Sequence, residues 1–170
     1  MTSYVALLRG VNIGGRLLKM QDLKSIAVEI GLDSPRTYIA SGNLLFESGK
    51  SELVLKRELE AALKAHFGKA VAVMLRTAQE LGAAVSANPF RDEPGNKVVA
   101  IFLDSAPPAD ATTNAVHLSD ERVALGEREI YVHYPSGIGG SKLRIPAALA
   151  GTARNMNTVA RLADLAMEQA

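Results

Sequence analysis

The succession of apolar runs over residues 4–75 restricts the possible folds more than any other pattern in the sequence. Tyr4 to Leu8 is unbroken and apolar, which predicts a strand buried on both faces. Apolar residues recur at helical spacing from Met20 to Ile30 and from Leu55 to Phe67, which predicts two amphipathic helices. Further strands are predicted over residues 36–40, 43–46 and 70–75. The order is strand, helix, strand, strand, helix, strand.

This order is that of the ferredoxin-like split βαβ module. Right-handed crossovers place the first and third strands at the centre of a four-stranded antiparallel sheet, with both helices on one face. Residues 36–40 mix polar and apolar side chains, which suits an edge strand. Ser51 predicts the N-cap of the second helix, and Gly68 predicts its end.

The prolines and glycine of residues 88–96 predict a domain boundary, after a linking helix capped by Thr77. We therefore expect residues 1–90 to form the ferredoxin-like module with its linking helix, and residues 91–170 to form a second module. Its expected strands are 97–103, 122–125 and 129–134, followed by a C-terminal amphipathic helix without a clear fourth strand. The fold class is α+β, with a second, smaller and incomplete module of similar order.

Composition limits the classes of function. Hydrophobic residues make up 48% and charged residues 22%, which is typical of a globular protein with a packed core. The 19 Lys and Arg against 18 Asp and Glu leave a net charge of +1, so no global field attracts nucleic acid, which is an unfavoured partner. The absence of cysteine excludes disulfides and thiolate chemistry. Without a targeting or membrane-spanning pattern, we expect a cytoplasmic protein that does not interact with a membrane.

Four sequence motifs occur in a fixed order along the chain. They are Arg9 to Gly15 (RGVNIGG), Arg36 to Asn43 with its SGN ending, Tyr134 to Leu143 (which contains GGSKL), and Thr152 to Val159 (TARNMNTV). Together they resemble the bacterial domain-of-unknown-function family numbered 1697. The resemblance implies an α+β fold with ferredoxin-like parts and implies no activity or cofactor. Met156 departs from the family pattern, which has tryptophan there.

The glycine-rich turn after the first strand is a candidate anion site. Gly14 and Gly15 let a ligand approach the backbone, and free N–H groups at the following helix start favour an anion, with Arg9 adding charge. The spacing matches neither the dinucleotide nor the phosphate-loop fingerprint. The alternative is a structural turn in which the Asn12 side chain bonds nearby backbone.

Two later segments carry similar groups. Ser141 and Lys142 follow a glycine pair, and Arg154 and Asn155 lie where the last helix is expected to begin. A pocket shared by both segments and Arg9 is the hypothesis that follows, and the sequence leaves open whether the three converge. The alternatives are a solvated lysine at position 142, and an Asn155 that only caps the helix beside an Arg154 paired with a carboxylate.

Tyr38 and Asn43 complete the candidate ligand-binding residues. Tyr38 either lines a pocket or covers the sheet, and Ser41-Gly42-Asn43 indicates hairpin chemistry more than catalysis. None of the three histidines has another ligand at metal spacing, so no metal site is expected. The cofactor is unknown, and the sequence leaves open whether the protein is an enzyme.

Three functions remain from these observations. The favoured one is a binding module for a small anionic or phosphorylated ligand. The second is a protein-interaction or oligomerisation module, because the apolar strand at 70–75 is expected at a sheet edge that must be covered. The sequence leaves the oligomeric state open between monomer and homodimer. The third is weak nucleic-acid binding, as some ferredoxin-like sheets achieve.

Overall fold

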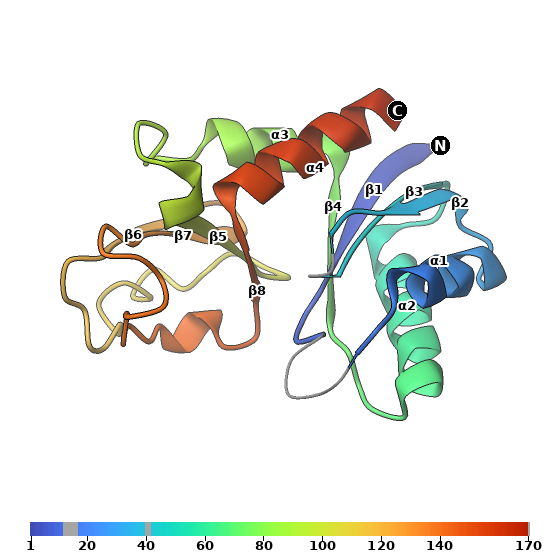
Figure 1. The fold of residues 1–170 in the computed structure, drawn as a ribbon, viewed down its shortest axis with the longest axis horizontal. Helices are drawn as coiled ribbons and strands as arrows, with labels where there is room; N and C mark the ends of the chain where they lie inside the picture. The colour runs from blue at the N-terminus through green and yellow to red at the C-terminus, as the bar shows by residue number, and fades with distance from the viewer. Residues whose placement is uncertain (12–16, 40–41, 170) are drawn as a thin grey trace. The chain divides into compact units, whose positions relative to one another are not determined.

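The computed structural model describes residues 1–11, 17–39 and 42–169, which include two four-stranded antiparallel sheets (Figure 1). The elements follow in the order β1 (Thr2–Leu8), α1 (Met20–Glu29), β2 (Asp33–Thr37), β3 (Asn43–Ser48), α2 (Glu52–Phe67), β4 (Val73–Thr77), α3 (Ala78–Ser86), η1 (Gly95–Lys97), β5 (Val98–Phe102), β6 (Arg122–Leu125), β7 (Glu129–His133), η2 (Pro146–Ala148), β8 (Thr152–Asn155) and α4 (Met156–Gln169), where η denotes a 3-10 helix. The α+β class is confirmed.

Contacts divide the chain into two units. The first unit comprises Met1–Leu81 and Leu162–Ala170, and the second comprises Gly82–Arg161. Both boundaries lie inside a helix, one in α3 and one in α4. We predicted two domains that divide at residue 90. Units defined by contacts do not test whether domains fold separately, so this division stays a prediction.

The first unit has the strand order β2-β3-β1-β4, so β1 and β3 are central and β2 is at an edge, as predicted. Val5 of β1 lies opposite Leu45 of β3 on one side and opposite Arg76 of β4 on the other. Helices α1 and α2 cover one face of this sheet (Figure 1). Tyr4, Ala6 and Leu8 point from β1 into the core beneath them, because alternate residues of a strand share a face.

The predicted helix signals are present. Ser51 Oγ accepts a hydrogen bond from Val54 N at 3.4 Å, and Gly68 ends α2 with φ of 73°. Thr77 Oγ1 accepts from Glu80 N at 3.1 Å, and Thr77 N donates to Glu80 Oε1 at 3.4 Å. This reciprocal pair is a capping box, which satisfies backbone donors at the start of α3.

The second strand begins earlier than predicted, at Asp33 rather than residue 36, and ends at Thr37. Ile39 has a φ of 52°, which interrupts the extended backbone that the apolar pattern suggested. The strand also contains Pro35, which an edge strand tolerates because one side of its backbone needs no partner.

The backbone of β4 faces alternately toward and away from β1. Arg9 N donates to Ala72 O at 2.9 Å, so residues 72, 74 and 76 bond β1, and Val73, Leu75 and Thr77 face outward. The strand is at a sheet edge, as predicted. Such outward groups are a template for pairing with another chain.

Side chains of the first unit occupy these outward groups. Lys56 Nζ donates to Val73 O at 2.6 Å, and Val73 N donates to Glu60 Oε2 at 2.9 Å. Lys56 and Glu60 are themselves an ion pair at 3.0 Å along α2. Arg76 Nη1 donates to Leu75 O at 2.8 Å. Side chains of the same chain therefore satisfy the outward backbone groups of Val73 and Leu75. The sequence did not indicate these bonds.

The second unit repeats the order of the first, as β6-β7-β5-β8. The expectation that it lacks a fourth strand was wrong, because Thr152–Asn155 pairs with β5 as β8, with Arg154 opposite Ala100. This strand has four residues of mixed polarity, so it carries no apolar run by which to recognise it. The sheet is complete, and the unit is incomplete only in its helices.

Equivalent positions at the ends of the two sheets have side chains with similar roles. Arg76 of β4 and Arg154 of β8 are both buried, and each donates to the carbonyl of the preceding residue. Thr77 caps α3, and Asn155 Oδ1 accepts from Thr158 N at 3.0 Å to cap α4. The likeness supports an internal repeat, which sequence identity alone was too weak to indicate.

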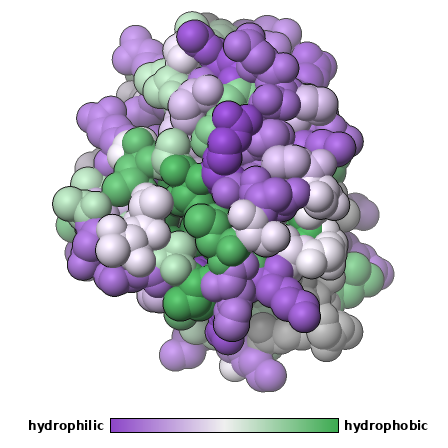
Figure 2. All heavy atoms as spheres, turned by 90° about the vertical axis from the view of Figure 1, so that its left-hand side faces the viewer, coloured by the Kyte–Doolittle hydropathy of each residue, from purple (hydrophilic) through white to green (hydrophobic). Residues whose placement is uncertain are grey.

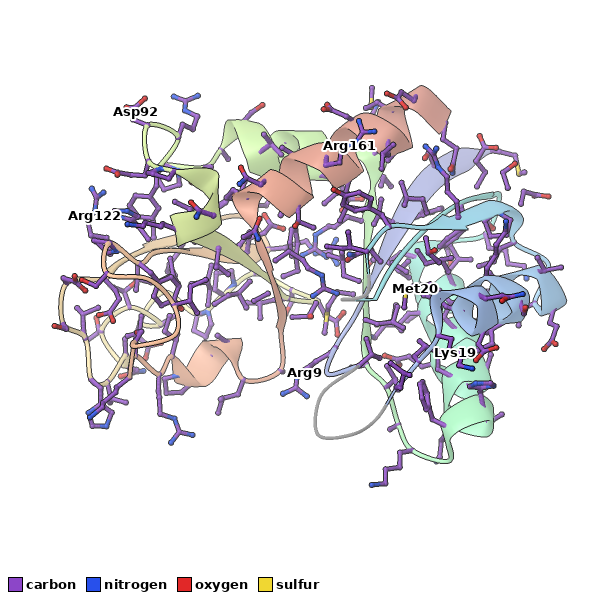
Figure 3. The ribbon with its side chains drawn as sticks, in the orientation of Figure 1. Arg9, Lys19, Met20, Asp92, Arg122 and Arg161 are labelled. Atoms are coloured by element: carbon purple, nitrogen blue, oxygen red, sulfur yellow. The ribbon has the colours of Figure 1, made fainter. Side chains whose placement is uncertain are left out.

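The segment predicted to be a domain boundary, residues 88–96, is anchored on the second sheet. Phe90 lies 5.8 Å from the ring of His133 and 4.9 Å beneath the guanidinium of Arg122, measured to ring centroids. Arg122 projects from β6 (Figure 3) and also pairs with Glu93 at 3.2 Å. This anchoring is a tertiary effect that prolines and glycine in the segment do not reveal.

Candidate functional site

The two units differ in what covers the equivalent face of the sheet. In the first unit α1 and α2 cover it, whereas in the second the loops of residues 103–121 and 134–151 do so. Val116 and Arg144 join the loops by two backbone hydrogen bonds of 2.8 and 3.0 Å. Loops on a rigid sheet are where binding residues concentrate.

A cavity of about 510 Å³ lies between these loops. Its volume is in the range of small-molecule sites. The polar side chains that line it include His117, Asp120, Glu121, Ser136, Ser141 and Lys142. Two of the predicted ligand-binding residues, Ser141 and Lys142, therefore share one cavity.

Hydroxyl groups hold both carboxylates of the cavity. Ser136 Oγ donates to Asp120 Oδ2, and Ser141 Oγ donates to Glu121 Oε2, each at 2.5 Å. Ser119 N donates to Glu121 Oε1 at 2.7 Å. Each serine thus ties the 134–151 loop to the 103–121 loop.

These bonds also set the charge of the cavity wall. The hydrogen bond from the Ser141 hydroxyl, followed by the bond from Ser119 N, lowers the pKa of Glu121 from its ordinary value of 4.5. Burial, with the neighbouring charge of Glu121, raises the pKa of Tyr134 from 10.0. At neutral pH Glu121 of the cavity wall is ionised, and the neighbouring Tyr134 is neutral.

Lys142 is exposed, and within the described residues its ammonium has neither an ion pair nor a hydrogen bond. The imidazole of His117 lines the same cavity and likewise has no hydrogen-bond or ion-pair partner within residues 1–11, 17–39 and 42–169.

Figure 2 shows hydrophobic side chains gathered among polar ones on the side that faces left in Figure 1. Leu118, which is exposed, adds an apolar group to the cavity.

Arg154 and Asn155 do not line this cavity. Arg154 is buried and donates to Thr152 Oγ1 at 2.7 Å and Ala153 O at 2.9 Å. Burial lowers its pKa to about 10, so it stays charged at neutral pH. Asn155 caps α4. These contacts explain both residue types without a ligand, and their ligand-binding role stays a prediction.

The glycine-rich turn lies largely outside the described residues, since Asn12, Gly14 and Gly15 are among those not described. Arg9 is exposed at the end of β1 (Figure 3). It belongs to the first unit, whereas Lys142 and Arg154 belong to the second. The proposed sharing of one pocket by these three residues stays a prediction.

Tyr38 and Asn43 flank the β2–β3 turn. Tyr38 N donates to Asn43 O at 3.1 Å, and Asn43 Nδ2 donates to Tyr38 O at 2.9 Å. Gly42 has a φ of 88°, and an added Cβ would lie 2.6 Å from Val11 Cγ2. The turn therefore needs a glycine, in agreement with hairpin chemistry, and a ligand contact of Tyr38 or Asn43 is untested.

The sequence interpretation missed His117, Asp120, Glu121 and Ser136 as cavity residues. The local signal was the adjacent pair Asp120-Glu121, but neither carboxylate has a catalytic partner at a recognisable spacing. Their serine partners are 16 and 20 residues further along the chain. Only the folding of the two loops against each other brings these groups together.

Within the part of the chain that the structure describes, no cluster of three or more His, Asp or Glu side chains is suited to hold a metal ion. No described helix has the length and apolar character to cross a membrane.

Comparison with known proteins finds a family and a related structure. The pattern of the family "Protein of unknown function (DUF1697)" matches residues 1–131, which leaves the Ser141-Lys142 segment beyond the match. A solved structure, the conserved bacterial protein SP0830 from Streptococcus pneumoniae, is 25% identical with a TM-score of 0.82. The alignment covers 98% of this chain and 99% of that one. No curated protein matches the chain.

Proposed function

This chain belongs to the DUF1697 family of proteins of unknown function, and we propose that it binds a small ligand with an anionic group in the cavity of its second unit. The observation that carries the proposal is the cavity of about 510 Å³, into which Lys142 brings an ammonium with no partner among the described residues. A lysine held at the wall of a small polar cavity is a point charge suited to a phosphate or carboxylate.

The repeat supports the same location. Both units have the same sheet order, and they differ where helices of the first give way to loops of the second. The bonds from Ser136 and Ser141 tie the two loops to each other, in addition to the packing of apolar loop residues on the sheet. Binding sites are typically built in this way, on a retained sheet whose covering helices are replaced by polar loops.

Amide NMR with stepwise additions of inorganic phosphate tests the proposal. We expect saturable shifts in residues 117–121 and 136–142, and a weaker response in Lys142→Gln. Lys24→Gln is the matched control, because Lys24 is an exposed lysine of α1 in the first unit. Absence of saturable shifts around the cavity, or equal affinities for Lys142→Gln and the wild type, would contradict the proposal. Saturable shifts at Arg9 and Arg154 would instead support the wider predicted site.

A further inference from the structure

We propose that the ligand of this cavity is a small zwitterion, with an ammonium group that pairs with Asp120 and an anionic group that pairs with Lys142. The inference rests on the proposed function and deepens it by naming the chemical class of ligand. Its basis is that groups of opposite charge line one cavity without pairing with each other.

Asp120 has an acceptor to offer. Its Oδ2 accepts the hydrogen bond from Ser136, and within the described residues Oδ1 accepts none. A carboxylate held on one oxygen is oriented, and its second oxygen remains available to a donor. A ligand ammonium bonds such an oxygen more strongly than a neutral donor does.

Glu121 contributes negative charge to the cavity but offers no unoccupied oxygen to a ligand. Both of its oxygens accept bonds, one from Ser141 and one from the backbone of Ser119, so it is already occupied as part of the wall. Its negative charge remains, because the bond from Ser141 lowers its pKa. Two carboxylates beside one lysine make a bare anion bind more weakly than a ligand that also carries positive charge.

A hydroxyl group on the ligand is the competing donor for Asp120. Two pairs of compounds separate the possibilities, because the members of each pair differ only in an ammonium or a hydroxyl. They are O-phosphoethanolamine against 2-hydroxyethyl phosphate, and β-alanine against 3-hydroxypropionate. Titration calorimetry or amide NMR on the full chain gives the affinities.

We expect at least one ammonium compound to bind about tenfold or more tightly than its hydroxyl counterpart, because a charged hydrogen bond is stronger than a neutral one. Asp120→Asn keeps an acceptor for Ser136 but removes the charge, so it is expected to abolish that preference. Binding of the hydroxyl compounds to Asp120→Asn is expected to stay the same or to strengthen.

The outcomes separate the two proposals. Equal affinities within both pairs overturn the zwitterion and leave anion binding in place. An ammonium preference that survives in Asp120→Asn also overturns it, because the donor then pairs elsewhere. No saturable binding of any of the four compounds at concentrations up to about 10 mM, which corresponds to less than about 3 kcal/mol of binding, overturns the proposed function together with the zwitterion.

Discussion

Replacing Glu60 by alanine tests whether α2 protects the outer edge of β4, which does not pair with β1. The substitution removes the acceptor of Val73 N, at 2.9 Å, and the ion-pair partner of Lys56, at 3.0 Å. Val73 is fully buried, and the Glu60 side chain is 32% exposed. Leaving a buried backbone donor unsatisfied costs about 1–3 kcal/mol, and water that reaches a partly exposed site lowers that cost. We expect a loss of about 1–2 kcal/mol in the free energy of unfolding.

Glu58→Ala is the matched control on the same helix. Glu58 pairs with Lys50 at 2.7 Å, and both side chains are more than a third exposed. Such a pair contributes about 0.2–1 kcal/mol, so the control is expected to lose less stability than Glu60→Ala. The change in helix propensity is the same in both variants and cancels. Glu60→Gln keeps an acceptor for Val73 N and is expected to fall between the two.

Urea unfolding followed by circular dichroism measures these differences in the free energy of unfolding. In thermal unfolding, about 1 kcal/mol corresponds to a shift of about 2–4 °C in Tm for a chain of this size. Light scattering on the double variant Lys56→Ala/Glu60→Ala tests the second consequence. An uncovered edge invites pairing between chains, so this variant is expected to self-associate more than the wild type. Equal destabilisation by Glu60→Ala and Glu58→Ala, or no rise in mass for the double variant, would refute the corresponding part of the reasoning.

Three further outcomes are expected. Gly42→Ala should destabilise the protein by more than about 1 kcal/mol, because φ is 88° and the new Cβ would lie 2.6 Å from a side-chain carbon; Gly49→Ala, where nothing lies within 4 Å, is the control in the same unfolding assay. Asn155→Ala should lose about 1 kcal/mol of stability with its cap on α4, whereas Asn155→Ser should recover most of it in thermal unfolding. Ser141→Ala should raise the pKa of Glu121 toward 4.5 in a carboxyl NMR titration. Since the folded pKa of Glu121 is depressed, its contribution to stability is present above 4.5 and is lost as pH falls through the folded pKa; an unchanged titration in Ser141→Ala would show that the hydroxyl is not the cause.

The candidate site was only partly accessible from the sequence. Lys142 and Ser141 were recognised because a cation and a hydroxyl follow two glycines, which is a local pattern. Asp120 and Ser136 were not recognised, because they lie in two different loops with β6 and β7 between them, and a hydrogen bond across 16 residues leaves no periodicity in the chain. For Arg154 and Asn155 the structure supplies contacts with their own strand and helix, which residue type alone did not distinguish from ligand binding.

The sequence by itself determined the first unit: apolar runs of strand and helix length, with Ser51 and Gly68 as helix ends, account for the order of its sheet. These are local signals, because propensity and capping act within a few residues. Only the tertiary structure decided that Thr152–Asn155 is a fourth strand, that Lys56 and Glu60 cover Val73, and that two polar loops enclose a cavity. Each of these features depends on contacts between residues far apart in the sequence. The free energy of such contacts is set by the folded structure, so neighbouring residues in the sequence give no sign of it.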